Sequence, residues 1–282
     1  MRIRKRGFDT KAFDCSSAHF LVGGIVRGDN TIARADREHG GVRELALDEA
    51  DLSVERLIPA LGQQIRVSVR AGSGVPLVLC NGIGASLEVL DPLVDQLDPD
   101  TTVVRFDVPG VGGSSDLMLP YNFPYLAAVL ARLLSTLGLG REGVDVLGLS
   151  WGGALAQQFA FQNPRRCRRL ILVAHQLLAA SVWSSLFALP LIRQPTLIVA
   201  GTDDPIIPVV NARIMGRLLP HATMHLHTGG HVELVTNAAE FAPLIESFRN
   251  GECTSRGSTR SPAAHDPSKL SRRLAMGRSC VR

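Results

Sequence analysis

Cysteines are few in this 282-residue sequence, and those present are widely separated. Their number is odd, and none of the short spacings typical of metal sites occurs among them. We therefore expect reduced thiols in a cytoplasmic protein. The sequence as a whole implies no metal ion and no organic cofactor. The five residues are Cys15, Cys80, Cys167, Cys253 and Cys280.

Long apolar runs are also missing. No stretch is long enough to span a membrane. Basic residues 2–6 resemble the start of a secretory signal, but the best apolar run after them, residues 20–26, is short, contains two glycines and lacks a convincing cleavage site. We thus expect neither a membrane span nor a secretory signal. No internal repeat is visible.

Charge separates the two ends from the middle. The formal net charge is +4, yet residues 250–282 hold seven Lys or Arg against two acids, and residues 1–11 hold five against one. The remainder is therefore acidic, whereas a nucleic-acid-binding domain would carry its basic patch on the folded part. We expect a flexible extension over residues 1–50, one folded domain over 51–249 and a flexible basic tail over 250–282, with no nucleic-acid partner.

The middle segment alternates strands with helices, which predicts one α/β domain with a mainly parallel sheet flanked by helices. A hydrophobic fraction of 45% is enough for one large core. Strands are expected at 54–60, 64–70, 76–80, 101–107, 144–149, 170–174, 195–201 and 222–227. Helices are expected at 87–97, 125–137, 154–161 and 238–248, the last with Asn237 as its N-cap.

The most informative motif is Gly148-Leu149-Ser150-Trp151-Gly152, at the junction between a predicted buried strand and a predicted helix. A serine in such a turn is held in a strained backbone conformation that points its Oγ away from the sheet. The flanking glycines are needed because the neighbouring backbone approaches too closely for a side chain. This pattern is typical of a nucleophile elbow, and it predicts Ser150 as the nucleophile.

A serine nucleophile needs a base and an orienting carboxylate, which follow it in the order Asp or Glu, then His, in this kind of fold. Asp203 and Asp204 lie in the turn after the strand predicted at 195–201. His231 follows the next predicted strand, in a glycine-containing loop that can bring its side chain inward. We therefore expect one of the two aspartates to orient His231, and His231 to act as the base.

Seven other histidines compete for that role. His175 is the strongest of them, because it follows the strand predicted at 170–174 at the edge where ligands bind in open α/β sheets, and it is an alternative pocket residue. Three others lie in the predicted extensions, and three lie on or beside the strand predicted at 222–227, where they are expected on the surface or in packing. These six are His19, His39, His265, His221, His225 and His227.

The chemistry also needs backbone N–H groups that stabilise a developing oxyanion. The turn Asn81-Gly82-Ile83-Gly84 follows the strand predicted at 76–80. We expect the N–H of Ile83 and that of Trp151 to form this oxyanion hole.

The sequence resembles the α/β-hydrolase superfamily, and more narrowly the intracellular depolymerases of medium-chain-length polyhydroxyalkanoates, over roughly residues 53–248. The resemblance rests on the stretches Leu79–Glu88, Arg105–Ser115, Ser150–Ala160, and Gln194–Leu197 with Asp204–Pro208. It implies the α/β-hydrolase fold, with Ser150 as nucleophile, Asp204 rather than Asp203 as the orienting acid, and His231 as general base.

One departure from that family is large. Its members carry a helical cap of several tens of residues that covers the pocket, whereas only about 20 residues separate Ala174 from Pro195 here. The segment 181–189 resembles the core helix that normally follows the cap. The resemblance therefore implies a reduced or absent cap and a site open to water.

These observations predict a serine esterase that cleaves small-molecule or polymeric carboxylic esters through an acyl-enzyme. Two alternatives stay open at this point. The same triad supports cofactor-free haloperoxidase or perhydrolase chemistry, and the fold occurs in non-catalytic binding proteins. The sequence does not determine the acyl chain length or the oligomeric state.

Overall fold

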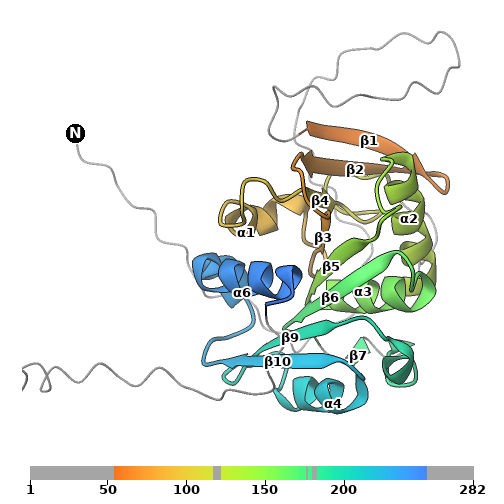
Figure 1. Cartoon of the computed structure of the whole chain (residues 1–282). Helices are drawn as coiled ribbons and strands as arrows, with labels where there is room; N and C mark the ends of the chain where they lie inside the picture. The colour runs from red at the N-terminus through yellow and green to blue at the C-terminus, as the bar shows by residue number, and fades with distance from the viewer. Residues whose placement is uncertain (1–53, 117–121, 176, 180–182, 253–282) are drawn as a thin grey trace, which may run out of the picture. The chain divides into compact units, whose positions relative to one another are not determined.

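The structure is a computed structural model that describes residues 54–116, 122–175, 177–179 and 183–252 (Figure 1). The extension predicted at 1–50 and nearly all of the tail predicted at 250–282 lie outside these residues, as do Cys15, Cys253 and Cys280. The described residues contain one eight-stranded sheet with helices on both faces. The predicted α/β-hydrolase architecture, with a mainly parallel sheet, is therefore confirmed.

The sheet has the strand order β1-β2-β4-β3-β5-β6-β9-β10. Strands β1 and β2 form an antiparallel hairpin, β2 pairs antiparallel with β4, and all remaining neighbours are parallel. The strands are β1 Val54–Ala60, β2 Gln63–Arg70, β3 Leu77–Cys80, β4 Val103–Phe106, β5 Val144–Leu149, β6 Cys167–Val173, β9 Thr196–Gly201 and β10 Ala222–His227. A separate pair, β7 Leu178–Ala179 and β8 Trp183–Ser184, is antiparallel.

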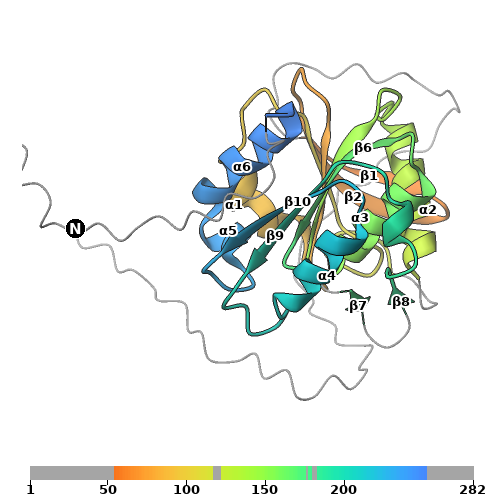
Figure 2. The same ribbon diagram turned by 60° about the horizontal axis from the view of Figure 1, so that its bottom comes forward.

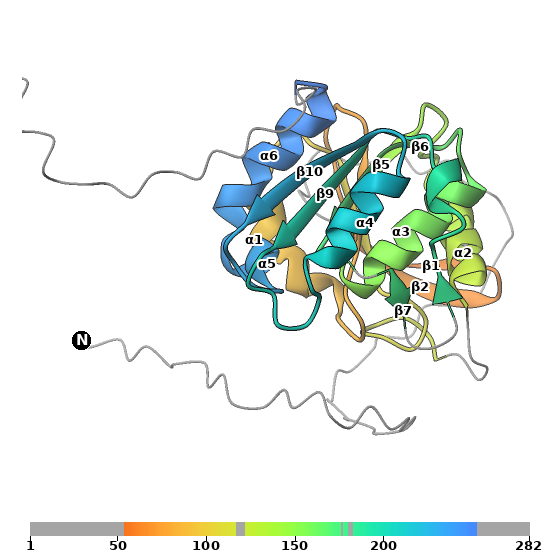
Figure 3. The same ribbon diagram turned by 90° about the horizontal axis from the view of Figure 1, so that it is seen from below.

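Helices cover both faces of the sheet, as Figures 2 and 3 show. One face carries α2 Phe123–Thr136, α3 Trp151–Gln162 and α4 Val210–Leu218, and the other carries α1 Asp91–Val94, α5 Glu233–Thr236 and α6 Ala238–Asn250. Each face has its own cluster of buried apolar side chains. Strands β3, β5 and β9 are buried along their whole length, because helices cover both of their faces.

Two predicted helices were wrong in detail. The helix predicted at 87–97 is instead a 3-10 turn η1 Leu87–Leu90 followed by α1, because Pro92 has no N–H to continue one helix through this point. The segment 181–189 is not a helix in its described part: β8 occupies Trp183–Ser184, and the 3-10 turn η2 begins at Leu189. There the N–H of Leu186 donates to Ser184 Oγ, a local bond that competes with helix formation.

The N-cap predicted for the last helix was correct in position but wrong in chemistry. Asn237 precedes α6, yet its side chain makes no capping bond to the backbone and instead donates from Nδ2 to Glu240 Oε2 at 2.5 Å. No described helix has both the length and the apolar character needed to cross a membrane.

Between β6 and β9 the described residues contain only the β7-β8 pair and η2, with no helical cap. The predicted reduction of the cap is therefore confirmed in this part of the chain.

Candidate active site

Three predicted site residues meet at one edge of the sheet. Ser150 follows β5, Asp204 follows β9 and His231 follows β10. Because β5, β9 and β10 all run in the same direction, their carboxyl ends lie at the same edge (Figure 3). The fold thus brings His231 together with Asp204, 27 positions away in the sequence, and with Ser150, 81 positions away.

Ser150 has the strained backbone expected of a nucleophile elbow. Its φ of 54° and ψ of −117° lie in a region that side-chain-bearing residues rarely occupy. A Cβ atom on Gly148 would lie 2.5 Å from Gly152 O, and one on Gly152 would collide with the carbonyl oxygens of Cys80 and Asn81. The glycines are therefore required by the close approach of the strand, the helix and the loop after β3.

A continuous hydrogen-bonded chain joins the serine, the histidine and the aspartate. His231 Nε2 lies 2.9 Å from Ser150 Oγ, and His231 Nδ1 lies 2.9 Å from Asp204 Oδ2. A carboxylate oxygen only accepts, so Nδ1 carries the imidazole proton and Nε2 is free to accept the serine proton. This is the arrangement that activates a weak hydroxyl nucleophile.

Asp204 is fixed by its own turn. The N–H groups of Ile206 and Ile207 donate to its Oδ1 at 2.8 and 2.9 Å, which leaves Oδ2 directed at His231. The Asp204 side chain is 1% exposed and that of His231 is 14% exposed. Asp203 is exposed, so the structure distinguishes between the two neighbouring aspartates.

The predicted oxyanion donors lie on two elements beside the serine. Trp151 is the first residue of α3, where the leading N–H groups have no partner within the helix and the helix dipole is positive. Among the described residues the N–H of Ile83 donates to no protein acceptor. A Cβ on the adjacent Gly82 would lie 3.9 Å from Ser150 Cβ, so this loop passes close to the nucleophile.

Asp107, which was not among the predicted site residues, supports the loop that carries Ile83. It is fully buried at the end of β4, and it accepts from Leu87 N at 2.7 Å and from Gly113 N at 2.8 Å. Asn81 holds the other end of the loop by donating from Nδ2 to Ser86 O at 2.6 Å. The signal for Asp107 was a carboxylate at the end of a buried strand, followed by a glycine-rich turn.

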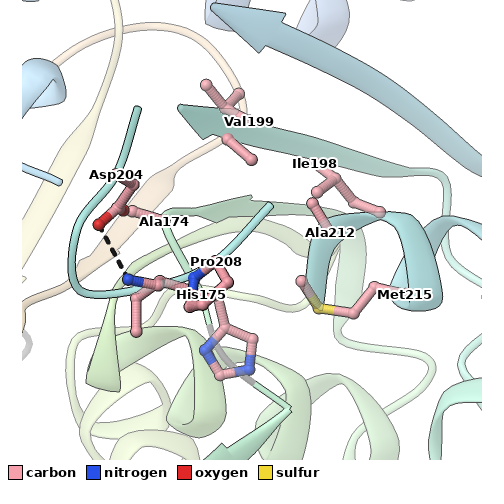
Figure 4. A pocket seen from close by; sticks show the side chains of 10 residues that line it. Ala174, His175, Ile198, Val199, Asp204, Pro208, Ala212 and Met215 are labelled. Atoms are coloured by element: carbon pink, nitrogen blue, oxygen red, sulfur yellow. Dashed lines mark hydrogen bonds between the residues drawn. The ribbon is translucent and has the colours of Figure 1, made fainter. Parts of the chain in front are cut away.

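His175 lies under the elbow rather than in the triad. Its Nδ1 is 2.8 Å from the carbonyl oxygen of Ser150, and the residue is only 3% exposed. Burial lowers the pKa of its imidazole to about 4. Figure 4 shows it beside Pro208 at a narrow space, too small for a water molecule, that Asp204 and Met215 also border.

The remaining histidines do not join the site. His221 is exposed, and His225 is partly buried on β10. His227 accepts from Gly229 N through its Nδ1 at 3.0 Å and packs edge-on against Phe241. His19, His39 and His265 lie outside the described residues. Within the described ranges, no three His, Cys, Asp or Glu side chains gather in an arrangement that could hold a metal ion.

Comparisons with known proteins show which family this chain is similar to. A family model for the alpha/beta hydrolase fold matches residues 75–187. A poly(3-hydroxyalkanoate) depolymerase of Ectopseudomonas oleovorans is 36% identical over 264 residues, which cover 70% of this chain and 93% of the relative. A soluble epoxide hydrolase of a Corynebacterium species is 34% identical over 105 residues, covering 37% of this chain and 36% of the relative.

Solved structures show the same fold. A thermophilic esterase of Thermogutta terrifontis superposes with a TM-score of 0.64 at 19% identity, covering 71% of this chain and 98% of its own. A meta-cleavage product hydrolase of Pseudomonas fluorescens gives a TM-score of 0.62 at 17% identity, covering 71% of this chain and 98% of its own.

The alignment with the depolymerase also bears on the missing cap. The 70% of this chain that takes part is fewer residues than the 264 aligned positions, so the relative carries residues that this chain lacks. Sequence similarity along nearly the whole relative and the fold shared with the solved structures lead to the same assignment. The chain belongs to the α/β-hydrolase family and is a hydrolase.

Proposed function

We propose that this hydrolase cleaves carboxylic esters through an acyl-enzyme, with Ser150 as nucleophile, His231 as general base and Asp204 as the orienting acid. The observation that carries the proposal is the pair of 2.9 Å contacts that join Ser150 Oγ to His231 and His231 to Asp204. They occur at a serine whose backbone is held in a strained conformation at the start of a helix.

In the first half of the reaction, Ser150 Oγ attacks the ester carbonyl carbon while His231 Nε2 takes the hydroxyl proton. The imidazolium then returns this proton to the leaving alcohol, and the acyl group stays on Oγ. In the second half, water attacks the acyl carbon, gives its proton to His231, and the carboxylic acid leaves as Oγ recovers a proton. Asp204 keeps the imidazole in the required tautomer throughout.

The oxyanion formed in each tetrahedral intermediate is stabilised by the N–H groups of Ile83 and Trp151. Two observations support this assignment. The Ile83 N–H has no protein acceptor among the described residues, and Trp151 is the first residue of α3. The dipole of this 12-residue helix adds to the stabilisation of negative charge beside Ser150. Removal of one such donor typically lowers kcat by about 100- to 1,000-fold.

The proposed substrates are esters of hydroxyalkanoic acids, as polymer ends or as shorter esters that reach an open site. The similarity to a poly(3-hydroxyalkanoate) depolymerase supports this class. Ile83 lies on the loop after β3, Ile206 lies two residues after Asp204, and Val232 follows His231. They are 76%, 53% and 56% exposed, so these apolar side chains are in contact with solvent. An acyl chain would gain little burial here, and we expect high KM values with weak selectivity for chain length.

A panel of p-nitrophenyl esters with acyl chains of increasing length tests the proposal, together with oligomers of 3-hydroxyalkanoates. The wild type is compared with Ser150→Ala and with the matched control Ser135→Ala, whose hydroxyl lies on the exposed side of α2. We expect hydrolysis by the wild type and the control, and none above background by Ser150→Ala. Equal rates in all three proteins would refute the proposal. Parallel reactions with hydrogen peroxide measure whether peroxide replaces water as the acyl acceptor.

We further propose a cytoplasmic location. Cys80 and Cys167 are both buried in the core, and both are free thiols. Two unpaired buried thiols suit a reducing compartment. Separation of cell fractions followed by immunoblotting tests this, and recovery in a secreted or periplasmic fraction would contradict it.

A further inference from the structure

The imidazole of His175 contacts the backbone of the nucleophile itself. His175 follows β6, and the preceding Ala174 has a φ of 47°, a conformation that is uncommon for a residue with a side chain. This turn directs His175 back beneath the elbow, where its Nδ1 lies 2.8 Å from Ser150 O. The side chain therefore contacts the main chain of the elbow at the Ser150 carbonyl.

The chemistry of the two atoms fixes the direction of this hydrogen bond. A carbonyl oxygen only accepts, so Nδ1 of His175 carries the proton and donates. Its Nε2 is buried and has no hydrogen-bond partner among the described residues. Since burial also lowers the pKa of the imidazole to about 4, the ring is neutral at neutral pH and donates from Nδ1 alone.

Both peptide groups of Ser150 are held from the same short segment of chain. The Ser150 N–H donates to Val173 O at 2.9 Å, and the Ser150 carbonyl accepts from His175 Nδ1. Ala174, between them, is anchored to the next strand by its N–H, which donates to Val199 O at 2.9 Å. A strained backbone persists only where its surroundings over-determine it, and this segment supplies such a restraint on each side of the nucleophile.

Gly153 makes room for the imidazole. A Cβ atom at this position would lie 2.5 Å from both Cγ and Nδ1 of His175. The Gly153 N–H also donates to the Ser150 carbonyl at 3.0 Å, so this oxygen accepts two hydrogen bonds. The absence of a side chain at Gly153 is thus matched to the ring that occupies the space.

We propose that His175 is a positioning residue for the nucleophile: its Nδ1–H holds the Ser150 carbonyl and thereby keeps the elbow in the conformation that presents Oγ to His231. This rests on the proposed function of Ser150. His175 does not touch the substrate, and it acts through the backbone of Ser150.

The main test compares His175→Leu, which removes the donor but keeps an apolar side chain, with His175→Asn, whose Nδ2 replaces the Nδ1–H donor. His221→Leu is the matched control, because His221 is exposed and precedes the amino end of β10, whereas the elbow follows the carboxyl end of β5. We expect His175→Leu to lower kcat roughly 10- to 100-fold with KM changed less than about threefold, since a small misplacement of a reacting group has an effect of this size. His175→Asn should recover most of the loss.

The rate of labelling by a fluorophosphonate probe separates this proposal from the function on which it rests. If the wild type is labelled at Ser150 and His175→Leu is labelled and turns over equally fast, the positioning role is overturned while the proposed function stands. If the wild type is not labelled and cleaves no ester, the proposed function itself fails. If His175→Leu and His175→Asn lose activity equally and in proportion to a lower Tm, the role is structural only and the proposal is overturned.

A measurement on the unaltered protein covers the case in which the variants do not fold. Long-range 1H-15N correlation spectra of the histidine rings report which ring nitrogen carries the proton. We expect His175 to be protonated on Nδ1 and unprotonated on Nε2 at pH 7, with its Nδ1–H protected from exchange with solvent. Protonation on Nε2, or rapid exchange of the ring proton, would overturn the proposal.

Discussion

Replacement of Asp204 by asparagine changes one atom of the triad, and the hydrogen bonds around it determine which tautomer His231 then adopts. The N–H groups of Ile206 and Ile207 require an acceptor at the position of Oδ1. The amide oxygen of the new side chain must therefore occupy that position, and its NH2 group faces His231. Because an NH2 group donates, His231 Nδ1 must accept, and its proton moves to Nε2.

A proton on Nε2 prevents His231 from accepting the proton of Ser150 Oγ, which lies 2.9 Å away. Loss of the correct tautomer in a triad of this kind lowers kcat about 10,000-fold, which corresponds to about 5.5 kcal/mol of transition-state stabilisation. The fold should lose little stability, because the amide satisfies every hydrogen bond that the carboxylate made. Initial rates on a p-nitrophenyl ester measure the first effect, and thermal unfolding measures the second.

Asp203→Asn is the matched control, because it makes the same chemical change at the exposed neighbouring position. We expect its kcat to stay within about twofold of the wild type, since exposed substitutions away from special features have small effects. An Asp204→Asn variant that retains more than a tenth of the wild-type kcat at unchanged Tm would refute the reasoning. So would equal losses in the two variants.

Three further predictions concern the supporting structure. Gly152→Ala should lower the free energy of unfolding by about 1–3 kcal/mol or more, because its Cβ would overlap the carbonyl oxygens of Cys80 and Asn81. Gly74→Ala is the control in urea unfolding and should be neutral, since no atom lies within 4 Å of the added Cβ. Arg249→Leu should lower the free energy of unfolding by about 3 kcal/mol, because it removes one of the two arginine partners of the fully buried Asp145. Arg168 still donates two hydrogen bonds to that carboxylate. Arg132→Leu, at an exposed position, is the control in the same unfolding assay. Cys80 and Cys167 should resist alkylation by iodoacetamide at pH 8 until the protein is unfolded, because burial raises the pKa of both thiols. Mass spectrometry of the peptides measures this, and alkylation of either thiol in the native protein would contradict it.

The elements that the sequence predicted best are those whose residues satisfy local rules. The elbow strand and the strand at 222–227 have the predicted bounds. A mostly apolar run in the first and an alternating pattern in the second both end at glycines or turns. The helix predicted at 87–97 failed because a single proline outweighed a suitable apolar pattern. The helix expected within residues 181–189 rested only on a resemblance to a helix in longer relatives. A local hydrogen bond from Leu186 N to Ser184 Oγ forms there instead, and the resemblance could not predict it.

The candidate triad was accessible from sequence because each member follows a strand whose carboxyl end faces the same edge. The choice between Asp203 and Asp204 depended on the resemblance, and the structure brings only Asp204 to His231. The roles of Asp107 and His175 as supports were not accessible, because each depends on a long-range contact with a backbone group. Periodicity and motif spacing contain no information about such a contact, which becomes visible only when the loops are placed in space.

The acyl-enzyme on Ser150 is most directly tested by mass spectrometry of the protein shortly after mixing with a fluorophosphonate or a slowly hydrolysed p-nitrophenyl ester. We predict one added group per chain, located in the peptide that contains Ser150, absent from Ser150→Ala, and formed at a strongly reduced rate in His231→Ala. Ester hydrolysis without any adduct, or an adduct on another residue that persists in Ser150→Ala, would contradict the proposed mechanism.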